Sequence, residues 1–495
     1  MTNWGLAPTT LAIFTAHRTD PTTYKRSGGR SSWEARTPTA ELLNIAERTT
    51  VETFIRNSRI RAHVKVAVIG LGYVGVPLAA AVAATGAKVV GVDIDPRKVD
   101  AINTGRSPLK GREPGLAELV AAQSSKGALR ATLDMAEVAR ADVVAVCVET
   151  PIEPSTHDPS YKALKSALTG LGRHLKRGAL VTIESTLAPG TMESVVRPAI
   201  ERASRLKVGR DFHLVHCPER LTGGKLLHNL TELPRILGAN EPVALRKAVA
   251  FYKRFVNADI HATDWTTAEV VKTAENAYWD VQIAFANEVA LISEELGVDA
   301  FRVRELVNTS PYRMMLIPGA GVGGHCIPKD PWLLVAPATQ TKPELIPTAR
   351  AVNDFMPKRM ARLVEEGLAA AGRKVKGAKV TVLGFSYREN TDDTRNSPSR
   401  EMIQELRRRG AEVVIHDPLA RSERGYAIVR DLKAAIRGAD CVAIVTAHEP
   451  YRKLDLKALK RAMRRHVIVD GRNVFAGPEV VKAGFVYRGI GKGQF

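Results

Sequence analysis

The chain has 495 residues, with 72 Lys and Arg against 52 Asp and Glu, and a formal net charge of +20 at pH 7. Such a length exceeds what one hydrophobic core fills and indicates two or three domains. The sequence has no apolar run of about 20 residues, no signal-peptide pattern and no paired cysteine motif, which excludes a membrane span and predicts a cytoplasmic protein without a metal site.

Residues 1–61 are rich in Thr, Ser, Arg and Pro. We expect this N-terminal extension to be largely disordered, apart from a helical pattern at about 40–59. The alternative is that translation starts further downstream.

The next predicted unit, residues 62–262, alternates strands and helices. Strands are expected at 64–69, 88–92, 143–148, 180–183 and 212–216, with a small-residue helix at 74–84. This order predicts a doubly wound parallel sheet.

A glycine-rich fingerprint follows the first strand and opens the first helix. Gly70, Gly72 and Gly75 permit a tight turn, close approach of a pyrophosphate and helix packing, and Tyr73 and Val74 lie between them. Asp93 ends the next strand, where its carboxylate accepts hydrogen bonds from a ribose. The pattern therefore predicts a dinucleotide site that prefers NAD to NADP.

Polar residues follow three later strands of this sheet. They are Glu149-Thr150, Ser185-Thr186 and Glu219-Arg220. Since the carboxyl ends of parallel strands meet at one edge, these side chains are candidates for a shared ligand site. Helix capping is the alternative role for such hydroxyls.

Residues 263–372 are predicted to form a helical middle domain that begins with one long helix at 265–296. Lys272 and Asn276 are four residues apart and share a face of that helix. Together they could stabilise an oxyanion, although a solvated lysine and a structural asparagine fit the spacing equally well.

A cysteine lies on a glycine-opened turn later in this domain. Gly323 and Gly324 precede Cys326, and Lys329 and Asp330 follow it. Lys329 could hold the thiol as the reactive thiolate, and Asp330 could orient a water. The alternative is a buried, unreactive cysteine.

Residues 373–495 repeat the strand-rich pattern at 379–384, 412–416, 440–445 and 467–469. The fold class is therefore α/β, with two Rossmann-like doubly wound domains joined by a long central helix and a helical middle domain.

These motifs together resemble the UDP-glucose/GDP-mannose dehydrogenases, the NAD-dependent nucleotide-sugar 6-dehydrogenases. The resemblance covers about residues 64–475. It is carried in chain order by Gly70 to Pro77, Glu149-Thr150-Pro151, Ser185-Thr186 with Pro189-Gly190-Thr191, Pro218-Glu219-Arg220, Lys272 with Asn276, Gly323 to Asp330, and Asp392 to Pro398.

The resemblance implies roles for the matching positions. Cys326 would be the nucleophile, Lys272 and Asn276 would hold the oxyanion, Asp330 and Thr186 would lie near the catalytic water, and Glu219 would lie beside the sugar. Substrate contacts would come from the residues Glu219, Arg220, Lys272, Asn276, Gly323, Gly324 and Arg395. Arg395 would reach the site either within its own chain or across a subunit interface. The resemblance also implies a homodimer or larger oligomer, a UDP-sugar partner bound by the C-terminal domain, and neither nucleic acid nor membrane as a partner.

Subgroup features favour an N-acetylhexosamine substrate. Arg220 replaces the phenylalanine usual in UDP-glucose enzymes, and Gly223 occupies the place of their second glutamate. The resulting hypothesis is oxidation of UDP-N-acetylmannosamine, with UDP-N-acetylglucosamine or UDP-glucose as alternatives. A two-electron hydroxyacid or polyol dehydrogenase, or a nucleotide-sensing binding protein, are the rivals from other classes.

Overall fold

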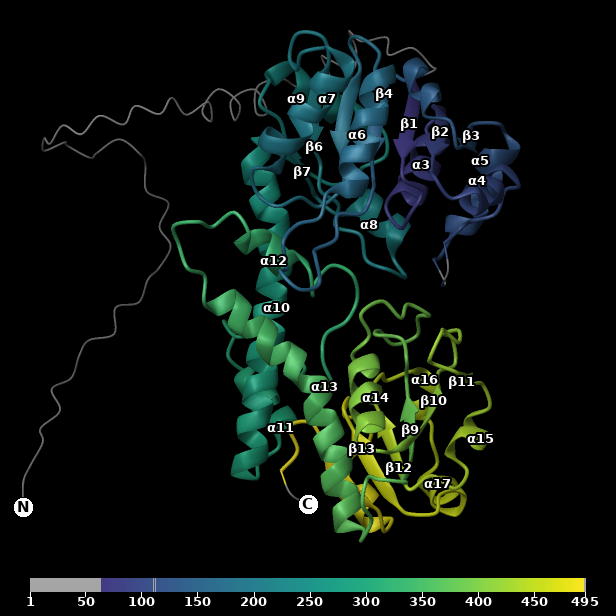
Figure 1. Ribbon diagram of the computed structural model, residues 1–495, viewed down its shortest axis with the longest axis vertical. Coiled ribbons are helices and arrows are strands. Elements are labelled where there is room, and N and C mark those ends of the chain that lie inside the picture. Colours follow the sequence, from purple (N-terminus) through teal and green to yellow (C-terminus); the bar gives the residue numbers. More distant parts are fainter. Residues whose placement is uncertain (1–63, 110, 112, 494–495) are drawn as a thin grey trace, which may run out of the picture.

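The computed structural model describes residues 64–109, 111 and 113–493. The predicted disordered extension and the helical pattern at 40–59 lie outside these residues. Two α/β units lie at opposite ends of the molecule (Figure 1). The long helices α10 and α13 run beside each other along the side of the C-terminal unit, and α10 extends to the N-terminal unit. The predicted fold class is confirmed.

The first unit contains an eight-stranded sheet in the order β3-β2-β1-β4-β5-β6-β7-β8. Neighbouring strands are parallel except β6 and β7. The strands are β1 (Lys65–Ile69), β2 (Lys88–Val92), β3 (Leu129–Thr132), β4 (Val143–Val146), β5 (Leu180–Ile183), β6 (His213–His216), β7 (Arg235–Gly238) and β8 (Ile260–Thr263). The helices are α3 (Gly75–Ala84), α4 (Pro96–Asn103), α5 (Leu116–Ser125), α6 (Lys162–His174), α7 (Arg197–Ser204), α8 (Leu226–Glu232) and α9 (Pro242–Tyr252), with short turns η1 (Met135–Arg140) and η2 (Met192–Val196).

Both faces of this sheet are buried. Successive side chains of a strand point to opposite faces, and in β1 Val66 and Val68 join one apolar cluster while Ala67 and Ile69 join another. A strand buried on both faces needs a continuous apolar sequence, which is why the central strands could be predicted.

The middle of the chain is helical. Helix α10 (Trp265–Leu296) has 32 residues and is about 48 Å long at 1.5 Å per residue. Asp264 caps its start by accepting the N–H of Thr267, and Gly297 ends it with φ +72°. The helices α11 (Ala300–Val307), α12 (Asp330–Val335) and α13 (Leu345–Ala370) follow.

The second unit has a six-stranded parallel sheet in the order β11-β10-β9-β12-β13-β14. Its strands are β9 (Lys379–Leu383), β10 (Glu412–His416), β11 (Ile428–Val429), β12 (Cys441–Ile444), β13 (Val467–Asp470) and β14 (Val486–Gly489). Its helices are α14 (Pro398–Arg408), α15 (Leu432–Ile436), α16 (Glu449–Arg452), α17 (Leu456–Ala462) and α18 (Gly477–Lys482).

The two units share a detail beyond strand order. After β1, Gly70 turns with φ +93° and Asp93 accepts the N–H of Leu71 at 2.7 Å. After β9, Gly384 turns with φ +96° and Asp417 accepts the N–H of Phe385 at 2.7 Å. Each half therefore braces the turn after its first strand with an aspartate from the end of the next strand.

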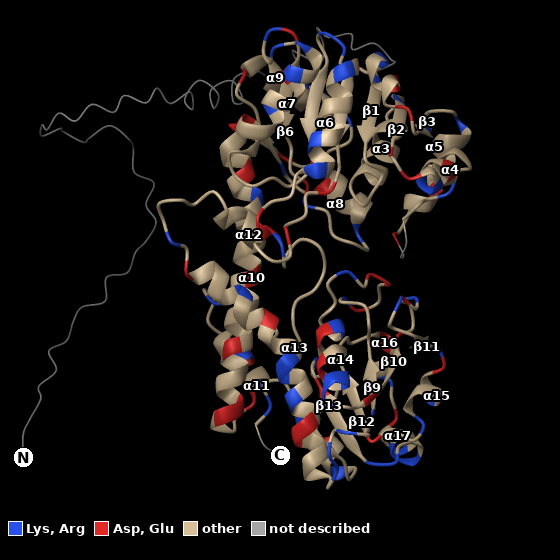
Figure 2. Ribbon diagram, in the orientation of Figure 1, with Lys and Arg blue, Asp and Glu red and all other residues tan. Residues whose placement is uncertain are grey.

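Basic side chains are distributed over the helices of both units (Figure 2). None of the helices formed by the described ranges is long and apolar enough to cross a membrane.

Candidate active site

The turn after β1 has the geometry that a pyrophosphate requires. Gly70 adopts a positive φ, and a Cβ at Gly75 would lie 1.8 Å from the Gly70 carbonyl oxygen. At Gly72 a Cβ would meet no heavy atom within 4 Å, so the space beside it is open. Helix α3 begins directly behind the turn, and its first N–H groups favour an anion. These residues fit the NAD predicted from the sequence.

Asp93 is buried beneath this turn. Its Oδ2 atom accepts the Leu71 N–H, its Oδ1 atom accepts the N–H of Asp95 at 2.9 Å, and Lys98 Nζ lies 3.0 Å from Oδ2. A carboxylate offers about four lone pairs, so Asp93 can brace the turn and still accept a ribose hydroxyl.

The polar residues after β4 and β5 bind one another. The Thr150 hydroxyl donates to the carbonyl oxygen of Thr186 at 2.6 Å, and the Ser185 hydroxyl donates to that of Val148 at 2.6 Å. Both hydroxyls thus join the two strand ends, and their first role is to fix the sheet edge against which a cofactor would lie.

The turn that carries Cys326 is held by the C-terminal unit. The Gly324 N–H donates to the Arg395 carbonyl oxygen at 2.9 Å, and Asn396 Nδ2 donates to the Gly324 carbonyl oxygen at 2.9 Å. A Cβ at Gly323 would lie 2.4 Å from the Cβ of Tyr387. Glycine is needed here because the turn is pressed against that tyrosine.

Charged and polar side chains gather around Cys326. Asn276 Nδ2 donates to Asp330 Oδ2 at 2.5 Å, and Lys329 Nζ lies 2.6 Å from Asp330 Oδ1. Burial acts to lower the pKa of Lys272, but attraction by Glu219, Asp330 and the other nearby acids outweighs it and raises that pKa. Lys272 is therefore a buried cation among these groups, and the structure brings together five of the predicted catalytic residues: Cys326, Lys272, Asn276, Asp330 and Glu219.

The thiol itself is protonated at neutral pH. Burial raises the pKa of Cys326 to about 11, and Asp330 and Glu219 add to the rise, while Lys272 and Lys329 oppose it. The prediction that Lys329 holds the thiol as thiolate is therefore wrong for the substrate-free protein. The main reason is the burial of the thiol, which raises its pKa, and the Lys329 ammonium also pairs with Asp330, whose charge offsets its effect on the sulfur.

Two predicted substrate residues have partners within the chain. Arg220 forms a two-pronged ion pair with Glu275 on α10 and donates to the Pro234 carbonyl oxygen at 2.7 Å. Arg395 pairs with Asp393 at 2.6 Å, and its guanidinium carbon lies 4.6 Å from the centre of the Tyr73 ring. Arg395 thus reaches the glycine-rich turn of its own chain.

An aromatic pair that the sequence did not predict lies nearby. The rings of His157 and Trp332 stack at 4.1 Å, which joins the loop after β4 to α12. The spacing of residues in the sequence does not predict such a contact between distant segments.

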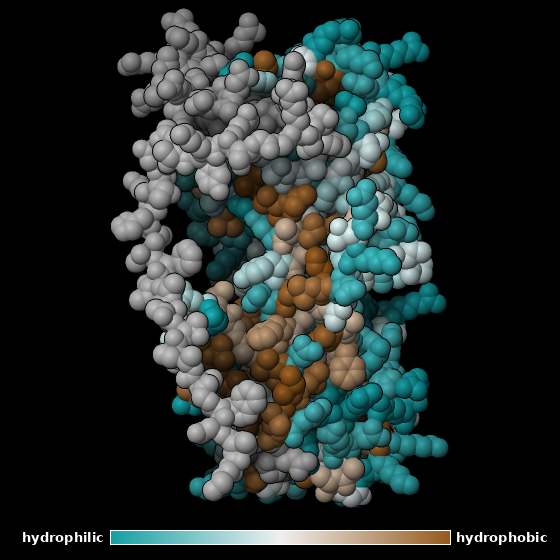
Figure 3. Space-filling model, turned by 90° about the vertical axis from the view of Figure 1, so that its left-hand side faces the viewer, coloured by the Kyte–Doolittle hydropathy of each residue, from teal (hydrophilic) through white to brown (hydrophobic). Residues whose placement is uncertain are grey.

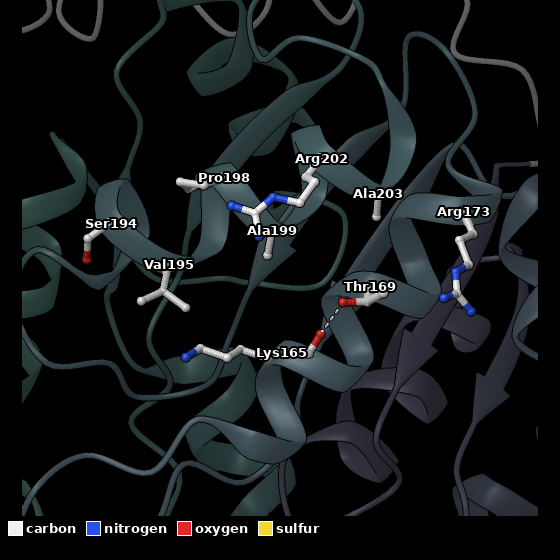
Figure 4. A pocket seen from close by; sticks show the side chains of 9 residues that line it. All are labelled: Lys165, Thr169, Arg173, Ser194, Val195, Pro198, Ala199, Arg202 and Ala203. Atoms are coloured by element: carbon white, nitrogen blue, oxygen red, sulfur yellow. Dashed lines mark hydrogen bonds between the residues drawn. The ribbon is translucent and has the colours of Figure 1, made fainter.

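A separate groove lies in the N-terminal unit. It has a volume of about 450 Å³ between α6 and α7 and is lined by Lys165, Thr169, Arg173, Ser194, Val195, Pro198, Ala199, Arg202 and Ala203 (Figure 4). None of these is a predicted site residue. Cys326 is the candidate active site, because a thiol, carboxylates and ammonium groups lie close together there.

The fold and the glycine-rich turn after β1 are those of an NAD-dependent dehydrogenase, and the candidate active site contains Cys326. The model of the UDP-glucose/GDP-mannose dehydrogenase NAD binding domain matches residues 64–256, the central domain 266–355 and the UDP binding domain 381–477. The chain therefore belongs to the UDP-glucose/GDP-mannose dehydrogenase family and is an NAD-dependent nucleotide-sugar dehydrogenase.

Curated relatives match most of this chain and nearly all of their own length. The chain is 38% identical to a UDP-N-acetyl-D-mannosamine dehydrogenase of Pyrococcus horikoshii, over 87% of this chain and 100% of the relative. It is 36% identical to an NDP-N-acetyl-D-galactosaminuronic acid dehydrogenase of Ralstonia nicotianae, over 84% and 97%.

Solved structures agree with this assignment. A UDP-D-ManNAc dehydrogenase of Pyrococcus horikoshii matches with a TM-score of 0.82 and 38% identity, covering 87% of this chain and 100% of the other. A UDP-glucose dehydrogenase of Pyrobaculum islandicum matches with a TM-score of 0.78 and 32% identity, covering 88% and 99%. Since a UDP-glucose enzyme has nearly the same fold, the fold alone does not choose the sugar.

Proposed function

We propose that this protein oxidises C6 of a UDP-N-acetylhexosamine to the carboxylate, with UDP-N-acetylmannosamine as the leading substrate. The proposal is supported by the surroundings of Cys326, whose thiol lies close to Lys272, Asn276, Asp330 and Glu219. The turn that carries Cys326 is hydrogen-bonded to the C-terminal unit. The names of the relatives, and Arg220 and Gly223 in place of the residues usual in UDP-glucose enzymes, favour the N-acetyl sugar.

NAD, when bound at the glycine-rich turn after β1, would supply the hydride acceptor for the two oxidations at C6. Between them the Cys326 sulfur adds to the aldehyde carbon and its proton passes to solvent or a neighbouring base, which leaves a thiohemiacetal. Loss of the second hydride gives a thioester, and attack of water on it releases the uronate and restores the thiol. In total, one alcohol group and one water are consumed and two NAD molecules are reduced to NADH.

Lys272 is the cation for the oxygen charge that develops at C6. It is 6% exposed, and water therefore screens its charge only weakly. Asn276 has two amide hydrogens, of which one donates to Asp330, so the second can donate to the same oxygen. Asp330 is also an acceptor that can orient the attacking water, and we assign Thr186 to the same water.

The substrate-free thiol must ionise during the reaction, since its pKa is about 11. A buried thiol that stays protonated until the aldehyde forms resists adventitious oxidation. The neighbouring carboxylates that keep it protonated are also the groups that can take its proton.

We propose the domain limits 62–262, 263–372 and 373–495 for the NAD-binding, central and UDP-sugar-binding parts, and the cytoplasm as the location. All four cysteines are free thiols, which fits a reducing compartment.

We also propose a homodimer through α10. Large apolar side chains are exposed along this helix and in the loop after α11, including Tyr278, Phe285, Leu296, Tyr312 and Met314. Figure 3 shows a continuous hydrophobic band down this side of the molecule. A contiguous exposed apolar face of this kind is typical of a protein interface.

The test is the amount of NADH released per sugar nucleotide, with UDP-N-acetylmannosamine, UDP-N-acetylglucosamine and UDP-glucose offered separately. Two NADH on an N-acetyl sugar is the expected result. Two NADH on UDP-glucose alone would overturn the substrate assignment, and one NADH would support a two-electron dehydrogenase. Cys326→Ser should form no acid and still bind UDP and NAD, whereas unchanged acid formation would remove the nucleophile role.

A further inference from the structure

Gly223 leaves a gap in the chemistry that the family resemblance implies, because glycine offers no carboxylate there. The structure places another acid beside it. A Cβ built on Gly223 would lie 3.7 Å from Oε1 of Glu113, which belongs to the segment between α4 and α5, more than a hundred residues away in the sequence. The side chain of a glutamate at position 223 would therefore start in contact with the Glu113 carboxylate.

Both oxygens of Glu113 bind the turn that carries Gly223. Oε1 accepts the Gly224 N–H at 2.7 Å and Oε2 accepts the Leu226 N–H at 3.3 Å. Leu226 is the first residue of α8, and Lys225, which precedes it, makes no capping bond with its own side chain. Glu113 therefore caps this helix from a distant segment, and a negative charge suits that end of a helix.

The turn held in this way is the one that presents Glu219 to the active site. Residues 219–226 connect the end of β6 to α8, and Glu219 lies close enough to Lys272 to raise its pKa. From the C-terminal unit, Arg388 Nη1 donates to the Gly223 carbonyl oxygen at 3.2 Å. The turn is thus fixed from both units.

The Glu113 segment also contacts the C-terminal unit directly. A Cβ at Gly111 would lie 2.9 Å from Oδ1 of Asp392, so the Asp392 side chain lies close to the Gly111 backbone. The loop 387–396 that contains Asp392 also carries Arg395 and grips the Cys326 turn. One short segment therefore links the Glu219 turn to the loop that positions the nucleophile.

We propose that Glu113 is a positioning residue for the reaction: its carboxylate fixes the 219–226 turn so that Glu219 stays beside Lys272. Glu113 acts as a hydrogen-bond acceptor, since both of its carboxylate oxygens accept backbone N–H groups. It does not supply the proton transfer of the absent second glutamate. The expected effect on the kinetics rests on the proposed function. The expected effect on the structure of the turn rests only on the two hydrogen bonds to Glu113.

The structural consequence is tested by hydrogen exchange of the full-length protein, followed by mass spectrometry. In Glu113→Ala the peptide that spans 220–227 should exchange about tenfold faster or more, because two amide hydrogens lose their acceptor. Peptides from α10 should be unchanged. Glu118→Ala is the matched control, because Glu118 is an exposed acid in the first turn of α5. It should change neither.

The kinetic consequence is that loss of the Glu113 carboxylate should impair the reaction of the UDP-sugar and leave NADH binding nearly unchanged. Glu113→Ala should raise KM for the UDP-sugar and lower kcat, with kcat/KM falling about tenfold or more, while the dissociation constant for NADH on the free enzyme changes less than about twofold. Glu113→Gln keeps one acceptor at the same length and should recover part of the loss. A general loss of folding would instead weaken NADH binding as well.

Unchanged exchange of 220–227 in Glu113→Ala would overturn the proposal, whatever the kinetics. Faster exchange with unchanged kcat/KM would also overturn it, because the turn would then be held without consequence for the reaction. Should Glu113→Ala fail to fold, Glu113→Asp is the second variant, since its shorter side chain cannot reach both amides. A wild-type protein without turnover on any UDP-sugar would refute the proposed function, and the exchange experiment would still decide whether Glu113 fixes the turn.

Discussion

The protonation of Cys326 gives a prediction whose size follows from the structure. A thiol with a pKa of about 11 is ionised in about one molecule in a thousand at pH 8, against about one in four for an ordinary cysteine of pKa 8.5. Only the thiolate attacks iodoacetamide. The free enzyme should therefore be alkylated at Cys326 about two hundred times more slowly at pH 8 than an exposed cysteine, and the rate should rise tenfold per pH unit.

Two substitutions should move this rate in opposite directions. Asp330→Asn removes a negative charge that raises the pKa of the thiol and frees the Lys329 ammonium, so alkylation at pH 8 should become faster. Lys272→Met removes a positive charge, so alkylation should become slower. A change of one pKa unit, which corresponds to about 1.4 kcal/mol, would give about a tenfold effect in each case.

The assay is loss of activity, or mass gain at the peptide that contains Cys326, measured between pH 7 and 10.5. Cys326→Ser supplies the background from Cys147, Cys217 and Cys441. A wild-type thiol that titrates near or below 8.5 would refute the reasoning, because burial and the two carboxylates would then not dominate. Shifts of the same sign in both variants would show that packing, and not charge, sets the reactivity.

Three further predictions concern other parts of the molecule. Lys272→Ala should lower kcat by about 10²-fold or more in single-turnover experiments, because it removes an oxyanion partner; a loss below fivefold would contradict that role. Phe285→Asp should yield monomers in light scattering, because Phe285 is 54% exposed on the hydrophobic face of α10, whereas Val481→Asp on α18 should leave the oligomer intact. Burial raises the pKa of Glu269 to about 7, so the folded protein binds this proton more tightly than the unfolded chain, and stability should fall as pH rises from about 4.5 to 7. Glu269→Gln should flatten that part of the profile of thermal midpoint against pH, and an unchanged slope would show that another group controls it.

The limits of several elements could be predicted closely. The strand 88–92, the strand 180–183 and the helix 265–296 were predicted with the limits that the structure has. Their apolar runs and periodicity are local and strong. The strands β3, β7, β8, β11 and β14 were not predicted, because they are short or contain polar residues and glycine. They form through pairing with neighbouring strands, which a local pattern does not record.

For the candidate site, too, some features could be predicted from the sequence and others could not. The sequence by itself determined which residue types are available: the glycines of the turn after β1, Lys272 and Asn276 one helical turn apart, and the Cys326 turn. Their chemistry follows from local spacing. These signals were sufficient for the family and the NAD cofactor.

Only the tertiary structure decided how these groups act on one another. Lys329 neighbours Cys326 in the sequence, yet its charge is offset by Asp330 in space. Arg220 is turned toward Glu275, and Glu113 reaches the Gly223 turn across more than a hundred residues. Electrostatic effects depend on distance and burial, which no local pattern encodes, and so the protonation of the nucleophile and the positioning of Glu219 emerged only when the chain was folded.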